Sequence, residues 1–212
     1  MTAMAAEPDL DLDMDEEPPS LDEVLWQAWL ALDLPEGYHA EIIEGSIEVS
    51  PTGRRSHGIV ANRLRDAFVP FLAGSDHAAY QDINLLHGSK VYIPDLCVAP
   101  RDLDSIPDPH GWGADATRVP LVAEVVSPGR EARQRDLVRK HRAYAQAGLP
   151  VYVVIDERDG PGHVTVHTQP DPAKGVYEAS IRMPYGTGVT IPDGPAKGFV
   201  IDTTITGEPR ES

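Results

Sequence analysis

The amino-acid sequence predicts a mixed α/β domain, of the α+β kind, with helices packed around a central mixed β-sheet. Residues 21–32 and 131–147 carry apolar side chains at helical spacing, and short runs rich in Val, Ile and Leu lie between and after them. One of these runs, Val151–Ile155, is apolar throughout, which is typical of a strand buried on both faces. The order of a helix, antiparallel strands and a helix between strands therefore predicts one domain around one sheet.

The first part of the chain is a strongly acidic segment. Nine of the 34 acidic residues fall within residues 1–23, which contain no Lys or Arg, so this stretch carries more than half of the net charge of −16. Such a composition cannot bury a core, and we expect residues 1–19 to form a disordered acidic tail. Residues 20–206 form the predicted folded domain, which is long enough to bury a sizeable core.

The first helix is predicted by its end signals. Ser20 and Glu23 match the S-x-x-E capping box, in which side chains satisfy free amides of the first turn. Apolar residues then recur at helical spacing as far as Leu32, and Pro35 and Gly37 mark the end of the helix.

The next segments alternate between strands and one helix. Two β-rich runs within residues 39–49 flank a Glu-Gly pair and predict a hairpin. Residues 54–73 are expected to form a helix. Residues 78–86 and 90–98 are then expected to form two strands around a short turn.

The second half carries the strand and helix that frame the candidate chemistry. Residues 100–119 are proline-rich and predict a long loop, and residues 121–126 form a short apolar strand that contains one acid. Residues 131–147 are the strongest helix prediction. The rest, to about residue 205, alternates short β-type runs with turns.

Composition excludes several classes of protein. The single cysteine, Cys97, excludes an intramolecular disulfide and a cysteine-rich zinc site, and it suits the reducing cytoplasm where we expect the protein. No apolar run approaches the roughly 20 residues that span a membrane, and the acidic N-terminus is unlike a secretory signal. Negative charge also opposes non-specific binding to phosphate backbones, so a nucleic-acid role must rest on local features.

Three acidic residues within otherwise apolar predicted strands are the main anomaly: Glu41, Asp95 and Glu124. A buried carboxylate without a partner is costly, so it normally pairs, accepts hydrogen bonds or binds a metal. Converging carboxylates repel one another unless a cation lies between them, and oxygen ligands suit Mg²⁺ or Mn²⁺ rather than zinc. The alternative is that each acid faces solvent or pairs with an arginine, and spacing alone leaves both readings open.

A family resemblance enters through the motifs around these acids. Pro94-Asp95, followed after 28 residues by Glu124-Val125-Val126, resembles the PD…(D/E)-x-K signature of restriction-endonuclease-like nucleases. More specific motifs follow in order, and together they resemble the bacterial Uma2 family of endonucleases over roughly residues 20–168: Tyr38–Gly45, His57, E-V-x-S-P at 124–128, D-x-x-x-K at 136–140 and Y-x-x-x-G-L-P-x-Y at 144–152.

The resemblance implies a restriction-endonuclease-like core and metal-dependent hydrolysis of phosphodiester bonds in nucleic acid, with DNA as the expected substrate. Asp95 and Glu124 would hold Mg²⁺ or Mn²⁺, helped by the carbonyl of Val125. Glu41 would complete the acidic cluster. The metal would polarise the scissile phosphate and activate a bound water.

The sequence departs from the superfamily pattern at one position. The superfamily's lysine lies two residues beyond the glutamate, where this chain has Val126. An apolar residue cannot orient a water, so the resemblance implies that Lys140, on the following helix, takes that role. The alternative for Lys140 is an ion pair with Asp136, four residues earlier on one helical face.

Basic residues near these motifs are the candidates for nucleic-acid contact. The densest basic segment contains Arg133, Arg135 and Arg139, and a second lies within residues 54–65. His57, near the start of a predicted helix, could contact phosphate or support Glu41. A solvated helix face is the alternative for the arginines, and a structural role is the alternative for His57.

Two other functions remain open at this point. A non-catalytic relative would keep the fold as a binding or interaction module, which Val126 and the negative charge favour. A different metal-dependent hydrolase would keep the acids but not the basic helix. A homodimer is compatible with the class, although no residue pattern demands one.

Overall fold

The computed structural model describes residues 17–51 and 53–209. Most of the predicted acidic tail, residues 1–16, lies outside the described residues, and residues 17–19 are exposed and without regular secondary structure. The elements of the described chain, in order, are α1 (Leu21–Leu30), β1 (Tyr38–Ile43), β2 (Ser46–Pro51), α2 (Arg55–Phe71), β3 (His77–Tyr80), β4 (Leu85–His87), β5 (Lys90–Tyr92), β6 (Leu96–Pro100), η1 (Leu103–Ser105), β7 (Ala114–Asp115), η2 (Ala116–Arg118), β8 (Leu121–Val125), α3 (Arg130–Gln134), η3 (Arg135–Arg139), α4 (Lys140–Gln146), β9 (Val151–Asp156), β10 (His163–Asp171), β11 (Val176–Pro184), β12 (Val189–Thr190), η4 (Gly194–Ala196), β13 (Val200–Ile201) and α5 (Thr203–Thr206).

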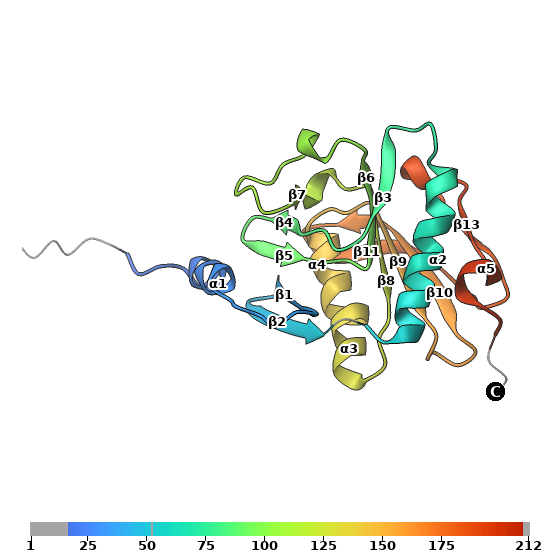
Figure 1. Ribbon diagram of the computed structural model, residues 1–212, viewed down its shortest axis with the longest axis horizontal. Helices are drawn as coiled ribbons and strands as arrows, with labels where there is room; N and C mark the ends of the chain where they lie inside the picture. The colour runs from blue at the N-terminus through green and yellow to red at the C-terminus, as the bar shows by residue number, and fades with distance from the viewer. Residues whose placement is uncertain (1–16, 52, 210–212) are drawn as a thin grey trace, which may run out of the picture.

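The central sheet has six strands in the order β11-β10-β9-β8-β6-β3. It is mixed, because β8 and β9 run parallel while the other neighbours are antiparallel. The helix that follows β8 supplies the crossover to β9, as a parallel pair requires. The predicted α/β class with a central mixed sheet is therefore confirmed (Figure 1).

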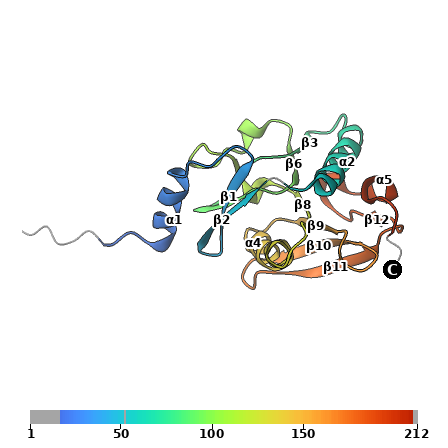
Figure 2. The ribbon, with the colours of Figure 1, turned by 60° about the horizontal axis from the view of Figure 1, so that its bottom comes forward.

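Each face of the central sheet has its own core. Apolar residues of α2, including Leu64 and Phe68, pack with the odd-numbered residues of β8 and with the C-terminal segment. On the other face, Ala143 and Tyr144 of α4 pack with the even-numbered residues Val122 and Val126. Figure 2 shows α2 and α4 on opposite sides of the strands. Glu124 belongs by strand alternation to the face that α4 covers.

A second sheet of five strands, in the order β2-β1-β5-β4-β7, corrects the expectation of a single sheet. Residues 78–86 and 90–98 do not form one strand each. Each breaks in the middle, so that β3 and β6 join the central sheet while β4 and β5 join the second one. Pro94, which has no N–H to donate, lies in one break, and Asp82 has a φ of 56° in the other.

The predicted hairpin and capping box are confirmed. Tyr38 to Ile43 pair with Ser46 to Pro51, and Glu44 and Gly45 both have positive φ, as a two-residue hairpin turn requires. Ser20 and Glu23 exchange both capping-box hydrogen bonds, although α1 ends at Leu30, before the predicted stop.

The segment predicted as a helix over 131–147 is helical from Arg130 to Gln146, but it contains one π-helical turn, η3. Such wide turns within α-helices are frequent near functional sites. The loop predicted over 100–119 contains only short elements, η1, β7 and η2. The short β-type runs expected after residue 156 include two nine-residue strands, β10 and β11, which form a long hairpin. Among the described residues, each helix is too short or too polar to cross a bilayer.

Candidate active site

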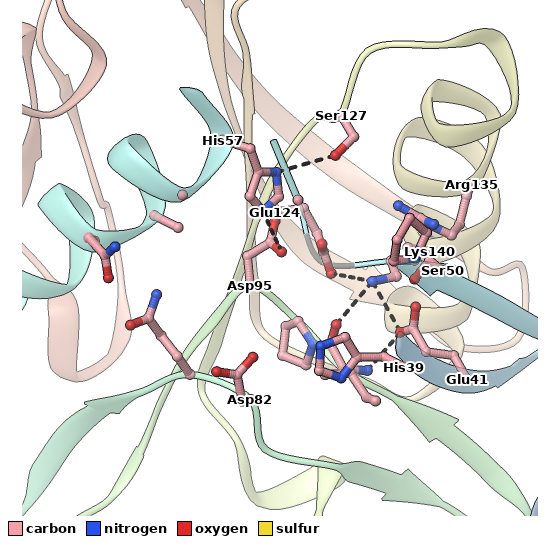
Figure 3. A pocket seen from close by; sticks show the side chains of 18 residues that line it. His39, Glu41, Ser50, His57, Asp82, Asp95, Glu124, Ser127, Arg135 and Lys140 are labelled. Atoms are coloured by element: carbon pink, nitrogen blue, oxygen red, sulfur yellow. Dashed lines mark hydrogen bonds and ion pairs between the residues drawn. The ribbon is translucent and has the colours of Figure 1, made fainter. Parts of the chain in front are cut away.

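A pocket of about 290 Å³ lies where the two sheets meet beside α2 and η3. Its lining includes all four residues predicted to be catalytic and the predicted phosphate contact His57 (Figure 3): Glu41, Asp95, Glu124, Lys140 and His57. These side chains come from β1, the β5–β6 connection, β8, α4 and α2. The fold therefore brings into one pocket residues that lie up to 99 positions apart in the sequence.

Strand register places the two predicted metal ligands side by side. Leu96 of β6 pairs with Ala123 of the antiparallel strand β8, so Asp95 stands next to Glu124. The Val125 amide donates a hydrogen bond to Asp95 Oδ2 at 2.7 Å, which fixes this carboxylate. Its other oxygen, Oδ1, lies 3.0 Å from His57 Nε2.

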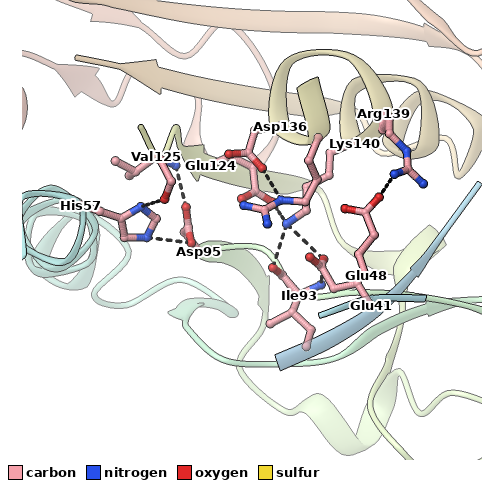
Figure 4. A network of polar contacts seen from close by, with 12 residues as sticks. Glu41, Glu48, His57, Ile93, Asp95, Glu124, Val125, Asp136, Arg139 and Lys140 are labelled. Carbon is pink, nitrogen blue, oxygen red and sulfur yellow. Dashed lines mark hydrogen bonds and ion pairs between the residues drawn. The ribbon is translucent and has the colours of Figure 1, made fainter. Parts of the chain in front are cut away.

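Lys140 reaches from the start of α4 into the same pocket. Its Nζ lies 2.9 Å from Glu124 Oε1 and 3.1 Å from Glu41 Oε1, and it donates to the Ile93 carbonyl at 3.1 Å (Figure 4). The side chain is 3% exposed. Among the ion pairs of the described chain, Asp136 pairs with Arg135 at 2.8 Å rather than with Lys140, so the alternative pairing is wrong.

Three contacts of the site were not anticipated from the sequence. The Tyr144 hydroxyl donates to Glu124 Oε1 at 2.6 Å, the Ile93 amide donates to Glu41 Oε1 at 2.7 Å, and Ser127 Oγ lies 3.3 Å from His57 Nδ1. The contact of Tyr144 could have been predicted from the sequence, because Tyr144 lies one helical turn after Lys140 on the same face of the helix. The Ile93 contact uses the backbone and leaves no signal in residue types.

The arginines predicted to bind nucleic acid all have partners within the protein. Arg133 pairs with Asp156 at 2.6 Å, and Arg135 pairs with Asp136. Arg139 forms an ion pair with Glu48 and donates to the Ile43 carbonyl at 2.9 Å, so it ties η3 to the β1–β2 hairpin. All three therefore also take part in holding the protein's own structure together, and their contact with nucleic acid stays a prediction.

A wider groove of about 1120 Å³ adjoins the active pocket. The two share Ser50, Gly53, Ser127 and Arg135 among their lining residues. Besides Arg135, the groove is lined by three arginines from the start of α2, the start of α3 and η3: Arg54, Arg130 and Arg139. Arg133 is not part of this lining.

Comparison with known proteins gives the chain a family. The sequence model of Uma2, described as “Putative restriction endonuclease”, matches residues 26–203. The chain belongs to the Uma2 family. The resemblance read from its motifs is thereby confirmed, and membership supports nuclease activity in general.

A solved structure extends the comparison to the Uma2 fold. The chain is similar to a crystal structure described as “a putative nuclease belonging to DUF820” from Anabaena variabilis, with a TM-score of 0.64 and 16% sequence identity. The match covers 90% of this chain and 98% of that chain. At this identity it establishes a shared fold. No curated protein matches the chain.

The electrostatics of this Uma2 pocket are dominated by buried carboxylates. Burial raises the pKa of Glu124 well above its ordinary value; Lys140 offsets part of this rise, and the nearby charges of Asp95, Asp136 and Glu41 add to it. Burial lowers the pKa of Lys140, but the charges of Glu124 and Glu41 outweigh burial, so the pKa of Lys140 is raised. Lys140 is thus shared by two carboxylates, Glu124 and Glu41, and an added cation would relieve the repulsion between them.

His57 balances Asp95 in the same manner. Burial opposes ionisation of both groups, but the hydrogen bond and charge of each favour the charged form of the other. The pKa of His57 is raised and that of Asp95 is lowered. A backbone hydrogen bond to Val125 also raises the pKa of His57, so the Val125 carbonyl faces the imidazole.

The donor set fits a hard divalent cation. Asp95 and Glu124 offer carboxylate oxygens, and Val125 offers a carbonyl, which are the ligands that Mg²⁺ and Mn²⁺ prefer. Across the described residues, no three His, Cys, Asp or Glu side chains cluster tightly enough to hold a metal by themselves. Mg²⁺ usually keeps several waters and needs only one or two carboxylates, so two side chains with a carbonyl suffice.

Proposed function

We propose that this chain is an endonuclease that hydrolyses phosphodiester bonds of nucleic acid, DNA first among them, with Mg²⁺ or Mn²⁺. The convergence of Lys140 with Glu124 and Glu41, in the pocket that also holds Asp95, carries the proposal. Membership in a nuclease family supports it. The contacts show one site rather than scattered acids, and the family gives that site a class of reaction.

The proposed cation ligands are Asp95, Glu124 and the Val125 carbonyl. A bound cation would supply Lewis-acid polarisation of the scissile phosphate and would lower the pKa of a water. Asp95 is held for this task by the Val125 amide, and Glu124 by the Tyr144 hydroxyl. These hydrogen bonds fix the carboxylates before a ligand arrives, so little reorganisation is needed.

Lys140 is the proposed group for holding the attacking water or the negative charge that develops on the phosphate. It replaces the strand lysine that Val126 cannot supply. Glu41 positions Lys140, since its Oε1 lies 3.1 Å from the ammonium and is itself fixed by the Ile93 amide. A carboxylate at this distance also keeps the ammonium charged, which suits stabilisation of negative charge rather than proton abstraction.

The groove is the proposed path of the nucleic-acid backbone towards the site. Arg54 and Arg130 face it from the starts of two helices. Phosphates are bound chiefly by lysine and arginine side chains, so these residues are better candidates than Arg133, which is held by Asp156. The proposed phosphate contacts therefore shift along the chain from those expected at first.

A non-catalytic binding module is the second candidate function. It is favoured by the partners that each acid already has within the protein: His57 for Asp95, and Lys140 for Glu124 and Glu41. In that case the ion pairs would be the final state of the site rather than a metal-free one. The two candidates differ in whether a divalent cation displaces or joins these pairs.

The test is incubation of the full chain with plasmid DNA and with single-stranded DNA, in Mn²⁺, in Mg²⁺ or in EDTA. We expect cleavage with the metals and none in EDTA. Asp95→Asn and Glu124→Gln should each abolish cleavage while the circular dichroism spectrum stays unchanged. Glu178→Gln, which changes an exposed acid on β11, is the matched control and should cleave at the wild-type rate. Wild-type cleavage by either site variant would refute the assignment.

A further inference from the structure

We infer that a second pocket next to the active site binds an unpaired nucleobase, so that the preferred substrate is single-stranded or locally unpaired nucleic acid. This inference rests on the proposed function, because the base would belong to the strand being cleaved. The pocket, here called the aromatic pocket, is lined mainly by Trp29, Leu32, Leu34, Tyr38, Asn84 and Trp112. It lies between the end of α1, the start of β1 and the loop before β7.

Exposed aromatic side chains are the first observation. Trp112 is 53% exposed and Tyr38 is 46% exposed, which is unusual for such large apolar rings that line one pocket. Trp29 stands edge-to-face against Trp112, with ring centroids 5.9 Å apart. The pocket volume of about 320 Å³ lies at the small end of the range for ligand sites. A single planar ring system suits this space.

The Trp29 ring and the backbone of the loop that carries Trp112 are held by hydrogen bonds. The buried Asp108 accepts hydrogen bonds from the His110 and Gly113 amides at 2.7 and 2.5 Å. Asn84 donates to the Trp112 carbonyl at 3.1 Å, and the Trp29 indole donates to the Ala40 carbonyl at 2.8 Å. Because hydrogen bonds fix the backbone of the loop that carries Trp112, binding needs to order less of this loop.

Continuity with the active pocket is the second observation. His39 and Ile93 line both pockets, and Ile93 is the residue whose backbone contacts both Glu41 and Lys140. Figure 3 shows His39 at the edge of the active pocket, beside Glu41. A strand whose phosphate lies at the proposed metal ligands can therefore place a neighbouring base over the aromatic pocket.

The groove and the aromatic pocket differ in charge, and this difference indicates which part of a nucleotide each would bind. The groove on one side carries Arg54 and Arg130, whereas no Lys or Arg is found among the described residues that line the aromatic pocket. Arginines bind phosphates, and aromatic rings stack on bases of any sequence. A base inside a duplex is already stacked and paired, so only an unpaired base can use such a platform. The substrate class follows from this difference.

The test measures binding without cleavage. Fluorescence anisotropy in EDTA compares the full chain with a labelled single-stranded oligonucleotide and with its duplex. We expect Trp112→Ala to weaken single-strand binding by about 5- to 100-fold, the range of one lost base stack, and to change duplex binding less than about twofold. The salt dependence of single-strand binding should be the same for Trp112→Ala and the wild type, because stacking neutralises no phosphate. Ile181→Ala, an exposed apolar residue on β11, is the matched control.

A second measurement locates the base. Abasic sites placed one by one along the oligonucleotide should weaken wild-type binding at one position, and Trp112→Ala should remove that position's effect, as coupled partners do. Equal binding of the single strand by Trp112→Ala and wild type, or no single-strand binding by wild type, would overturn the inference. The proposed nuclease activity is judged by a different result. Cleavage by the wild type, with no effect of Trp112→Ala on single-strand binding, would refute the role of the aromatic pocket alone. Single-strand binding that depends on Trp112, without cleavage, would refute the nuclease activity alone.

Discussion

Replacement of Lys140 by methionine tests how the site is held together without metal. The substitution keeps a long unbranched side chain but removes the ammonium that lies 2.9 Å from Glu124 and 3.1 Å from Glu41. Removing one partner of a buried ion pair leaves uncompensated charge and typically costs about 3–5 kcal/mol. We expect the free energy of unfolding at pH 7 to fall by about this amount. At pH 5 the loss should shrink, because Glu124, whose pKa is raised by burial, then takes up a proton.

Urea denaturation, followed by circular dichroism at both pH values, measures this loss. Lys174→Met is the matched control, since Lys174 pairs with Asp171 and Glu178 on the exposed surface and its removal should leave the midpoint almost unchanged. In the double variant Lys140→Met/Glu124→Gln, one of the two stranded charges is gone, so part of the stability should return. A loss below about 1 kcal/mol that is also independent of pH would refute the idea that this ammonium compensates buried carboxylates.

Two further predictions follow from shifted pKa values. Because folding raises the pKa of Glu124, the native state keeps this proton to higher pH than the unfolded state does. Stability without metal should therefore fall as pH rises above about 4.5. Urea midpoints from pH 5 to 8 should show this fall in the wild type, and an equal fall in Glu124→Gln would contradict the explanation. Burial and His141 lower the pKa of His167 to about 4, so the unfolded state binds the proton first and stability should fall as pH drops from about 6.5 to 4. His167→Gln should flatten that part of the profile by roughly 1–3 kcal/mol, and an unchanged slope would mean that His167 is not the group responsible.

The local elements of the fold could be predicted because their signals are local. The Ser20 capping box and the Glu44-Gly45 turn are short patterns with a direct physical cause, and both occur in the structure as expected. The second sheet could not be predicted in this way. It depends on β1 pairing with β5, which meet at Ile42 and Val91, and nothing within either segment specifies the other.

The candidate site shows the same division. The apolar settings of Asp95, Glu124 and Glu41 indicated buried acids; Glu41 and Glu124 are buried, Asp95 is half-buried, and the pocket holds all three. The roles of the arginines could not be predicted from charge, because a run of basic residues gives their number but not their partners. Arg139 illustrates this, since its contacts with Glu48 and Ile43 lie more than 90 positions away and bind the helix to the hairpin.

The missing lysine of the superfamily signature has a geometric explanation. Residue 126 lies two positions beyond Glu124, so strand alternation places both on the face that α4 covers. Val126 is 1% exposed and packs in the same core cluster as Ala143 and Tyr144 of α4. A lysine at 126 and a lysine at 140 would thus approach Glu124 from the same side of the sheet. Because Lys140 on the helix supplies the ammonium, residue 126 can be apolar and fill the space beneath the helix. The E-x-K motif is then absent from the strand, while the positive charge at the site is kept.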